Sequence, residues 1–264
     1  MNGIEKISSR DNQRLVNARK VRDGRVDGRV FIEGRRLVEE ALRSGVEIEE
    51  CFFASGFGDD DLVYAAAEKA RNTFELSEKL FDSIADTKNP QGIILIAKRP
   101  SGGSAGIEKR LGTGQPIVLF LKEINNPANL GAILRTAEAA GVAGVIVSEN
   151  SSDIYSPKAL RAAMGSSLRL PVWEDASFAD VMKWAGERNL TTTATDIGAS
   201  HLYTDVDWKR PRLLIFGSEA YGLAVEDIAA VDETILIPME NGVESLNLAV
   251  SAGIILFEAK RQNA

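Results

Sequence analysis

The rest of the chain is organised around one stretch, TILIPMENGVESLNLAVSAGIILFEAKRQ, which runs from Thr234 to Gln262. It begins with a short β-prone apolar run that Pro238 stops, and a polar loop then leads into a long helix. The helix carries apolar residues on two faces, one formed by Leu248, Ala252, Ile255 and Ala259 and the other by Val250, Ile254 and Phe257. Because a helix with two apolar faces must bury both, we expect the second face to pack against a twin subunit.

The loop that enters this helix occupies the position at which open α/β sheets bind ligands, beyond the carboxyl end of a strand. Ser245 and Asn247 place polar side chains there, at the N-terminus of the helix. Either side chain can also act only as a helix cap, which is the simpler interpretation. The stretch by itself therefore leaves a ligand site and a plain cap both open.

The composition is that of one large or two modest globular domains, with 44% hydrophobic and 26% charged residues in a chain of 264. The single cysteine, Cys51, excludes an intramolecular disulfide, and with the single histidine, His201, it excludes an ordinary zinc site. The N-terminus lacks the apolar core of a signal peptide, and no apolar run is long enough to span a membrane. We therefore expect a soluble, cytoplasmic protein with no metal and no membrane partner.

The net charge of −7 is unevenly distributed along the chain. Residues 1–36 contain ten Lys and Arg against five Asp and Glu, a balance of +5, whereas the remaining 21 basic and 33 acidic residues give −12. A basic segment ahead of an acidic body is a plausible footprint for the phosphates of a nucleic acid. The alternative is a solvated, mobile arm, and charge alone does not choose between the two.

Apolar periodicity in the first 98 residues predicts a small α/β domain. Helices are predicted over residues 4–23, 35–44, 61–71 and 78–85, and strands over residues 30–32, 50–54, 74–76 and 93–97. The next segment, Arg99 to Pro116, has five glycines, two serines and two prolines but only two large apolar residues. Since this composition cannot build a core, we predict domains over residues 1–98 and 116–264 with a linker over residues 99–115.

The second domain is predicted to be a doubly wound α/β domain with about five or six strands. Asn126 is expected to cap its first helix, with Pro127 in the first turn and Gly141 at the end. Further helices are predicted over residues 158–164, 178–187 and 225–230. Strands are predicted over residues 117–121, 145–147, 168–172, 190–195, 213–216 and 234–237.

Two more polar loops follow apolar strands of this domain. In LKEINNPANLGAILRTAEAAG, Asn129 lies near the helix start, and Arg135 follows a glycine and an alanine that leave room around its guanidinium. In IFGSEAYGL, Glu219 lies between two glycines, and Gly217 allows the backbone to approach a ligand closely. Each feature alone has a simpler interpretation. Arg135 can be a solvated arginine, Asn129 can hydrogen-bond only to nearby backbone, and the loop around Glu219 can be a simple turn. No Gly-x-Gly-x-x-Gly fingerprint follows these strands, which disfavours a dehydrogenase.

The combination is more specific than its parts. Asn-Pro-x-Asn-x-Gly-x-x-x-Arg-Thr-Ala-x-x-Ala-Gly, Phe-Gly-x-Glu-x-x-Gly-Leu and Ile-Pro-Met…Ser-Leu-Asn-Leu-Ala-Val…Glu-x-x-Arg-Gln occur in this order with fitting gaps. Together they resemble the three signature motifs of the SPOUT superfamily, SpoU (TrmH) branch, over Ile117 to Gln262. These proteins are RNA ribose 2′-O-methyltransferases that depend on S-adenosyl-L-methionine (AdoMet). FIEGRRLVEEAL and TKNPQGIILIA in the first domain resemble that branch's substrate-binding domain of ribosomal-protein-L30e-like fold.

The resemblance implies a deep trefoil knot in the last strands and helix, although connectivity rules would not predict one. It also implies a homodimer whose composite site places an arginine beside the other subunit's AdoMet. When the functional residues of the family are transferred to the matching motif positions of this sequence, the catalytic residue is Arg135. The residues that assist it are then Asn129, Glu219, Ser245 and Asn247. The residues that line AdoMet are Gly217, Ile237, Met239, Leu246 and Asn247. No metal is implied.

The sequence departs from the family pattern at Asn126, where aspartate is usual, and at Tyr221, where a smaller residue is common. Neither position is expected to do the chemistry, but Tyr221 could narrow the mouth of the site. The chemistry suits Arg135 as a cation that stabilises a developing alkoxide and grips a phosphate, because a guanidinium keeps its proton and cannot act as a base.

The expected substrate is RNA, and ribosomal RNA is preferred because the L30e-like domain is typical of the ribosomal RNA enzymes of this branch. Two alternatives remain open: a transfer RNA 2′-O-methyltransferase, and a non-catalytic RNA-binding protein that keeps a knotted domain only for dimerisation. Binding of AdoMet would separate the last alternative from the enzymes.

Overall fold

The computed structural model describes residues 3–113 and 116–264, and the chain divides into two compact units. Unit 1 comprises the residues up to Ser101 together with Ile154–Arg169. Unit 2 comprises Gly102–Asp153 and Leu170–Ala264. Residues 114 and 115 of the predicted linker lie outside the described residues. The chain therefore passes between the units three times, whereas the sequence suggested a single crossing.

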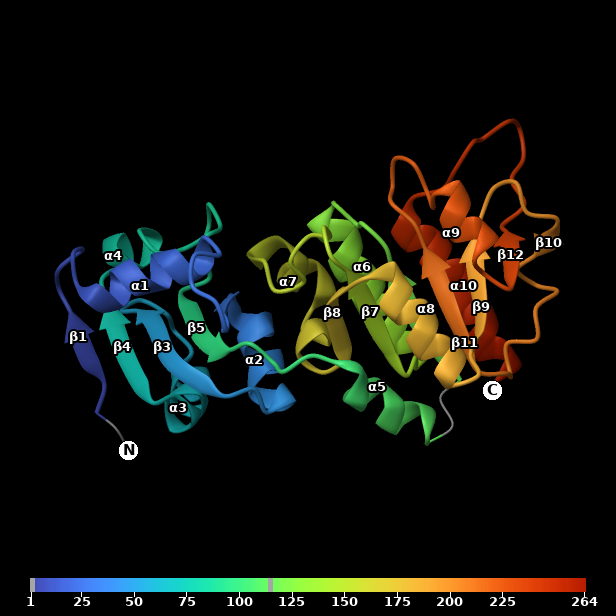
Figure 1. The fold of residues 1–264 in the computed structure, drawn as a ribbon. Helices are drawn as coiled ribbons and strands as arrows, with labels where there is room; N and C mark the ends of the chain where they lie inside the picture. Colours follow the sequence, from blue (N-terminus) through green and yellow to red (C-terminus); the bar gives the residue numbers. More distant parts are fainter. Residues whose placement is uncertain (1–2, 114–115) are drawn as a thin grey trace. The chain divides into compact units, whose positions relative to one another are not determined.

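Unit 1 contains a five-stranded mixed sheet with the strand order β1-β4-β3-β5-β2 (Figure 1). Its strands are β1 (Glu5–Ile7), β2 (Arg29–Glu33), β3 (Ile48–Ala54), β4 (Asn72–Leu76) and β5 (Ile93–Lys98). The pairs β1–β4 and β4–β3 are parallel, and β5 is antiparallel to both β3 and β2. The strands other than β5 consequently point the same way, and their carboxyl ends meet at one edge.

The helices of unit 1 follow these strands in alternation. They are α1 (Gln13–Arg22), α2 (Arg35–Ser44), α3 (Asp60–Lys69), α4 (Glu78–Asp82) and, from later in the chain, α7 (Pro157–Ala163). The boundaries of α2 match the prediction, and Gly45 ends it in a left-handed conformation with φ of 77°. The apolar patterns of the sequence thus predict most helices and strands of this unit.

The prediction of one helix over residues 4–23 is wrong at its start. Glu5–Ile7 pair with β4 as an edge strand, with Ile7 buried, and the helix begins only after Asn12, whose side chain accepts from the amide of Arg14. The mobile-arm interpretation is also wrong for this segment, because Leu15, Ala18 and Val21 are buried in the core of unit 1. The basic segment is thus an ordered layer of the unit from Glu5 to Arg22.

The segment Ile154–Arg169 packs into unit 1 although both of its neighbours in sequence belong to unit 2. Arg161 forms an ion pair with Asp86 at 2.7 Å, and Arg169 forms one with Glu40. Gly165, with φ of 86°, passes so close to Glu40 that a Cβ would lie 2.6 Å from the Glu40 Cβ. These contacts join residues more than 70 positions apart, so no local sequence signal indicates them.

Unit 2 contains a seven-stranded, fully parallel sheet with the strand order β10-β12-β9-β11-β6-β7-β8. Its strands are β6 (Ile117–Leu121), β7 (Gly144–Ser148), β8 (Val172–Ala176), β9 (Thr191–Thr195), β10 (His201–Leu202), β11 (Arg212–Phe216) and β12 (Glu233–Leu236). The doubly wound parallel fold is confirmed. The strand predicted over residues 168–172 is wrong in position, because a 3-10 turn (Ser166–Leu168) precedes β8 and the strand begins only at Val172.

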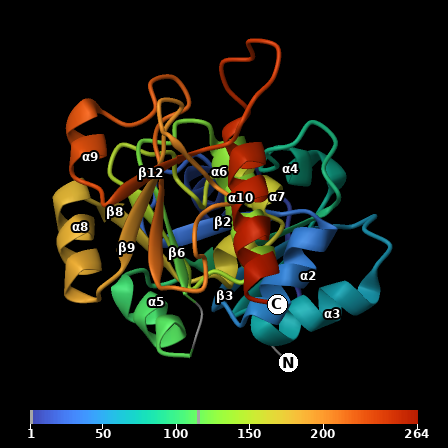
Figure 2. The ribbon, with the colours of Figure 1, turned by 90° about the vertical axis from the view of Figure 1, so that its right-hand side faces the viewer.

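Helices cover both faces of this sheet. Figure 2 shows α8 (Phe178–Glu187) and α9 (Val225–Ala229) on one side and α6 (Pro127–Ala140) and α10 (Leu248–Gln262) on the other. The helix α5 (Ser104–Leu111) lies inside the predicted linker, and its Ile107 is fully buried in the core of unit 2. The interpretation of this segment as coreless is therefore wrong. Leu111 packs against the same core, and Gly144 makes room for Ile107: a Cβ at Gly144 would lie 2.6 Å from Ile107 Cγ1.

The long helix α10 runs alongside α6 (Figure 2). Lys260 Nζ donates to the carbonyl of Ala139 at 2.7 Å, near the ends of both helices. The inner face of α10 is buried at Ala252, Ile255, Leu256 and Ala259. On the other predicted face Val250 is 51% exposed and Phe257 is 49% exposed, whereas Ile254 is partly buried, so the described residues cover this face of α10 only in part.

Candidate active site

Two of the three polar loops start from neighbouring strands. The strands β6 and β11 pair in parallel, with Leu121 opposite Phe216, and the amide of Lys122 donates to the carbonyl of Phe216 at 2.9 Å. The third loop follows β12, which is separated from β11 only by β9. All three loops therefore leave the same carboxyl edge of the sheet, where doubly wound folds bind their ligands.

The loop after β11 is a tight turn closed by main-chain hydrogen bonds between Ser218 and Gly222, at 3.0 Å in both directions. A side chain at Gly217 would overlap the main chain of Gly222. Glycine is therefore required there by the return of its own loop, and a role for Gly217 beside a ligand stays a prediction. Tyr221 lies in the same turn and is 92% exposed.

Glu219 of this turn is held by three donors from the loop and helix that follow β6. Its carboxylate accepts from the main-chain amides of Asn125, at 3.2 Å, and Asn126, at 3.3 Å, and from Asn129 Nδ2 at 3.3 Å. Asn129 Oδ1 in turn accepts from Asn247 Nδ2 at 3.1 Å. We call Glu219, Asn129 and Asn247 the polar network. It joins the three loops through side chains that all belong to the predicted site.

The polar network is attached to the N-termini of two helices. Asn126 caps α6 by accepting from the amide of Ala128, and Asn247 caps α10 by accepting from the amides of Ala249 and Val250. A carboxylate beside the start of α6 is also favoured by the helix dipole. The cap interpretation of Asn247 is thus correct, and the same side chain also contributes the donor that reaches Asn129.

Arg135 and Ser245 do not join the polar network within one chain. Arg135 lies on α6 six residues after Asn129, and its side chain is exposed. Among residues 3–113 and 116–264, no hydrogen bond or ion pair reaches either side chain. The structure therefore brings together three of the five predicted catalytic residues and leaves the other two with free polar groups.

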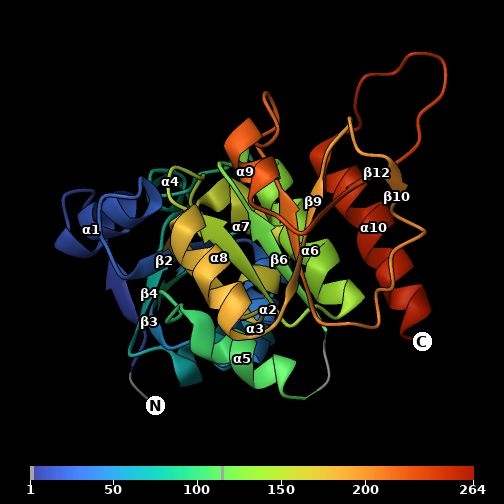
Figure 3. The ribbon, with the colours of Figure 1, turned by 45° about the vertical axis from the view of Figure 1, so that its right-hand side comes forward.

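The loop between β12 and α10 stands out from the body of unit 2 (Figure 3). Its residues 237–246 contribute one described main-chain hydrogen bond outside helices and strands, from the amide of Val243 to the carbonyl of Glu240. Val243 is 52% exposed and Leu246 is 37% exposed. Main-chain polar groups and apolar side chains of this loop are thus available to a ligand, and this fits a cofactor that is held mostly through backbone.

Sequence reasoning did not identify the support beneath the loop after β6. Glu123 adopts a left-handed conformation with φ of 56°, and its amide donates to Ser148 Oγ at 2.8 Å. Ser151 Oγ accepts from the amide of Ile124, and Ser152 Oγ donates to the carbonyl of Asn125 at 2.7 Å. Serines after β7 therefore fix the turn that presents two amides to Glu219. The only sequence signal was the clustering of serines after an apolar strand.

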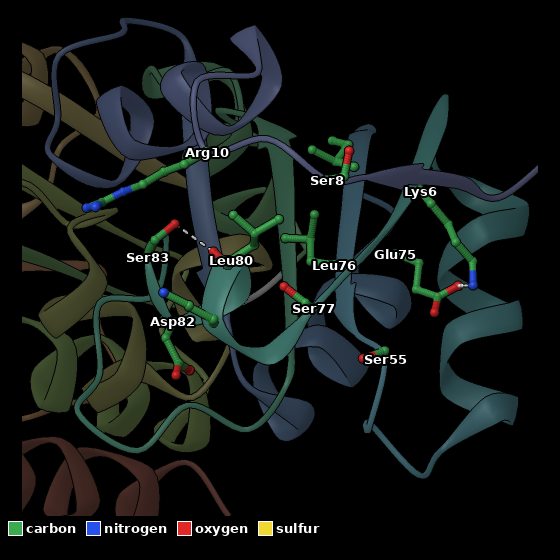
Figure 4. Close-up of a pocket in the computed structure, with 12 residues that line it drawn as sticks. Lys6, Ser8, Arg10, Ser55, Glu75, Leu76, Ser77, Leu80, Asp82 and Ser83 are labelled. Carbon is green, nitrogen blue, oxygen red and sulfur yellow. Dashed lines mark hydrogen bonds and ion pairs between the residues drawn. The ribbon is translucent and has the colours of Figure 1, made fainter.

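Two hollows lie away from the polar network. One of about 940 Å³ is in unit 1 at the carboxyl ends of β1 and β4 (Figure 4), and one of about 530 Å³ is in unit 2 beside α5. None of the predicted site residues lines either of them. Within the described ranges, no cluster of three or more His, Cys, Asp or Glu side chains is placed to hold a metal ion. None of the described helices is long and apolar enough to cross a bilayer.

Two family models match the chain in separate segments. The model of the SpoU rRNA Methylase family matches residues 116–257. The model for RNA 2′-O ribose methyltransferase substrate binding matches residues 31–102. The first segment contains the whole polar network and Arg135, and the second begins in β2 and ends just after β5.

Individual relatives match over nearly the whole chain. An uncharacterized tRNA/rRNA methyltransferase of Synechocystis sp. is 31% identical over 98% of this chain and 94% of its own length. The 23S rRNA (guanosine(2553)-2′-O)-methyltransferase RlmP of Bacillus subtilis is 30% identical over 97% of this chain and 100% of its own. The crystal structure of an AdoMet-bound rRNA methyltransferase from Sinorhizobium meliloti is similar with a TM-score of 0.83, at 28% identity over 99% of both chains. The similarity thus includes both units.

Proposed function

This chain belongs to the SpoU rRNA methylase family, and from this premise we propose which of its residues perform the reaction. It is an AdoMet-dependent RNA methyltransferase that acts on a ribose 2′-hydroxyl. The observation that supports a site in unit 2 is the polar network, in which Glu219, Asn129 and Asn247 are joined by hydrogen bonds across three loops. Such a network fixes the geometry of side chains before a substrate arrives.

We propose ribosomal RNA as the substrate, in the cytoplasm. The support comes from relatives: the Bacillus subtilis protein is named for 23S rRNA, and the Sinorhizobium meliloti protein is named an rRNA methyltransferase. The domain organisation also supports it, with an RNA-binding domain in the first 98 residues and a methyltransferase domain from residue 116. In this organisation α7 belongs to the binding domain by its packing. The exposed ring of Tyr221 is proposed to narrow the mouth of the site and to influence the choice of substrate.

The residues proposed to hold AdoMet are Gly217, Ile237, Met239, Leu246 and Asn247. The open main chain of the loop after β12 and the exposed side chain of Leu246 support this assignment. When bound, AdoMet supplies an electrophilic methyl group on a sulfonium. Asn247 is fixed by its capping bonds, so it offers a rigid edge to the ligand, whereas Ile237 and Met239 offer main-chain donors and acceptors.

Arg135 is proposed as the catalytic residue. Its guanidinium has no partner among the described residues, so its five donors are available to a substrate. A guanidinium can bind a phosphate through two parallel hydrogen bonds and place positive charge beside the 2′-oxygen as negative charge develops there. Because it keeps its proton, Arg135 does not accept the hydroxyl proton. Ser245, also exposed, is proposed to assist it at the substrate.

We further propose that the site is composite and forms in a homodimer. Val250, Ile254 and Phe257 form the apolar face of α10 that the described residues cover only in part, and a second copy buries it. Arg135 would then work beside the polar network of the partner subunit. This arrangement accounts for the lack of contact between Arg135 and the polar network of its own chain. The deep trefoil knot of this superfamily is proposed for the segment from β11 through α10.

The reaction is tested by incubating the protein with labelled AdoMet and either ribosomal RNA or transfer RNA, and then mapping the 2′-O-methyl positions. We expect methylation at a defined position in ribosomal RNA and a much slower reaction at the same position with the Arg135→Ala variant. Methylation of transfer RNA alone would contradict the substrate. Binding of AdoMet without transfer to any RNA would support the non-catalytic alternative and contradict the proposed function.

A further inference from the structure

The hollow in unit 1 opens at the carboxyl ends of three parallel strands, β1, β4 and β3 (Figure 4). Its lining comes from the connections that follow these strands, including Ser8 and Arg10 after β1, Ser55 after β3, and Ser77 and Lys79 after β4. Its volume of about 940 Å³ lies in the range of sites that enclose small molecules or single nucleotides. The position follows the same rule that places ligands in doubly wound sheets.

The hollow combines an apolar centre with a polar rim. Figure 4 shows Leu76 and Leu80 at the centre, with Arg10 on one side and Lys6 on the other. Serine hydroxyls lie between these positions, at Ser8, Ser77 and Ser83. An apolar surface edged by hydroxyls and cations suits a nucleotide unit of RNA, which combines a flat base, a ribose hydroxyl and a phosphate.

The charges of the rim are only partly compensated within the protein. Lys6 forms an ion pair with Glu75 at 3.2 Å. Over the part of the chain that the structure describes, the charged ends of Arg10 and Lys79 have no such partner. The carboxylate of Asp82 points away from the centre of the hollow in Figure 4. Two free cations therefore remain on the rim, in a protein whose residues after position 36 carry a balance of −12.

The turn that carries Arg10 is fixed before any ligand arrives. Arg19 Nη2, from α1, donates to the carbonyl of Arg10 at 3.0 Å. The amide of Asp11 donates to Ser9 Oγ, and Asn12 caps α1 immediately afterwards. The basic helix α1 thus holds the connection after β1 in place, so Arg10 loses little main-chain freedom on binding.

We propose that this hollow binds an unpaired nucleotide of the substrate RNA together with its phosphate. Arg10 and Lys79 contact the phosphate, Ser8 and Ser77 contact the ribose hydroxyl, and Leu76 and Leu80 contact the base. This inference rests on the proposed function and adds to it a surface of unit 1 that binds the substrate RNA. It also assigns a role to β1 and α1, which precede the segment matched by the substrate-binding family model.

The test uses the full-length Arg10→Ala/Lys79→Ala variant, because Ile154–Arg169 packs into unit 1 and a truncated chain would lack part of one unit. The probe is a single-stranded oligouridylate of about 12 nucleotides, within the range of known single-strand sites. Each lost phosphate contact lowers the slope of log affinity against log salt by about 0.7. Because both cations contact the same phosphate, we expect the slope to fall by about 0.7 and the affinity at moderate salt to fall about tenfold or more.

The control variant is Arg43→Ala/Lys69→Ala, which removes the same charge. These residues lie at the C-terminal ends of α2 and α3, at the opposite edge of the sheet. We expect the control to keep the wild-type slope. An unchanged slope in the Arg10→Ala/Lys79→Ala variant, or an equal loss in the control, would overturn the proposal. Ser77→Ala should reduce the preference for oligouridylate over its deoxy counterpart, because the 2′-hydroxyl distinguishes the two.

Failure of this inference is distinguishable from failure of the proposed function. If wild-type protein methylates ribosomal RNA while Arg10→Ala/Lys79→Ala binds oligouridylate normally, only the nucleotide site is wrong. If the variant loses RNA affinity as expected while wild-type protein transfers no methyl group to any RNA, the site stands as an RNA site and the proposed function fails. Affinity for AdoMet and the thermal midpoint should be unchanged, since neither side chain has a partner to lose.

Discussion

Asn129 and Arg135 lie on the same helix, six residues apart, and they differ completely in their bonding. Asn129 uses its amide in both directions, donating to Glu219 and accepting from Asn247. Arg135 makes no hydrogen bond or ion pair with any described residue. A side chain that holds loops in place must be satisfied inside the protein, whereas a side chain that acts on a substrate must remain available. The contrast supports our proposal that Asn129 holds the loops of the site in place and that Arg135 acts on the substrate.

The largest effect is expected from placing a charge on the partly covered face of α10. Ile254→Asp should abolish the dimer, because an unpaired carboxylate cannot be buried between two helices. A composite site would then be incomplete, and methyl transfer should be lost altogether. Light scattering measures the oligomeric state. Tyr64→Asp, a similar change on an exposed side chain of unit 1, should remain dimeric. A monomeric and active wild-type protein would contradict both the dimer and the composite site.

Loss of Arg135 should be nearly as severe. Arg135→Ala is expected to lower turnover by about two to three orders of magnitude, the scale for one preorganised electrostatic group. Arg135→Lys should recover only part of this loss, because lysine keeps the charge but lacks the planar fork. Affinity for AdoMet, measured by calorimetry, should barely change in either variant. Loss of AdoMet binding with normal turnover at saturating AdoMet would make Arg135 a cofactor or packing residue instead.

A mixed dimer tests whether Arg135 and the polar network act across two subunits. When Arg135→Ala and Glu219→Ala subunits are co-expressed, one composite site carries both lesions and the other carries none. Activity in the mixed dimer should therefore rise well above that of either variant alone. If both parts belonged to one chain, every site would carry one lesion and the mixture would be no more active than the variants.

A smaller effect is expected when the two roles of Asn247 are separated. Asn247→Ser keeps a good N-cap for α10 but lacks the amide that donates to Asn129. The free energy of unfolding should change by only a few tenths of a kcal/mol. Turnover should fall by about fivefold, as expected for one hydrogen bond worth about 1 kcal/mol. An equal loss in stability and turnover would show that Asn247 acts only through the helix cap.

The smallest effect concerns an ion pair in unit 1. Arg14 pairs with Glu50 at 2.6 Å, and burial raises the pKa of the Glu50 carboxyl although Arg14 opposes the shift. Arg14→Ala should therefore raise this pKa further and destabilise the fold by about 1 kcal/mol. Because the folded-state pKa exceeds the unfolded value, this loss should grow as pH rises through the folded pKa and shrink in acid. Urea unfolding at two pH values measures it, and a loss independent of pH would assign the effect to packing on Phe74.

Sequence patterns predicted the elements whose signals are local. The helices α2, α6 and α8 were predicted correctly at their starts because their signals are local: apolar periodicity in all three, and in α6 also the cap Asn126 followed by Pro127. The strand β1 and the helix α5 were missed, because each is stabilised by a distant partner. Ile7 is buried in an edge strand that pairs with β4, and Ile107 fits only because Gly144 leaves space.

The sequence predicted which residues belong to the candidate site better than it predicted how these residues are arranged. Motif order indicated Asn129, Glu219 and Asn247, and the structure joins them. The contribution of Asn125 could not be predicted, since it donates from its main chain and depends on serines after β7. Gly217 was selected for a different reason from the one the structure gives. The roles assigned to Arg135 and Ser245 stay predictions that the experiments above test.

Because the chain passes between the units three times, the elements of the two units are synthesised in an interleaved order. The sheet of unit 1 is complete once β5 has been made, but α7, which packs into the same unit, is made only after β6, α6 and β7 of unit 2. Unit 2 in turn cannot bury α6 until α10, the last fifteen helical residues, has left the ribosome. A nascent chain halted before α7 therefore holds two incomplete units, whereas a chain halted between α7 and α10 holds a unit 1 with all of its elements and a unit 2 that still exposes α6.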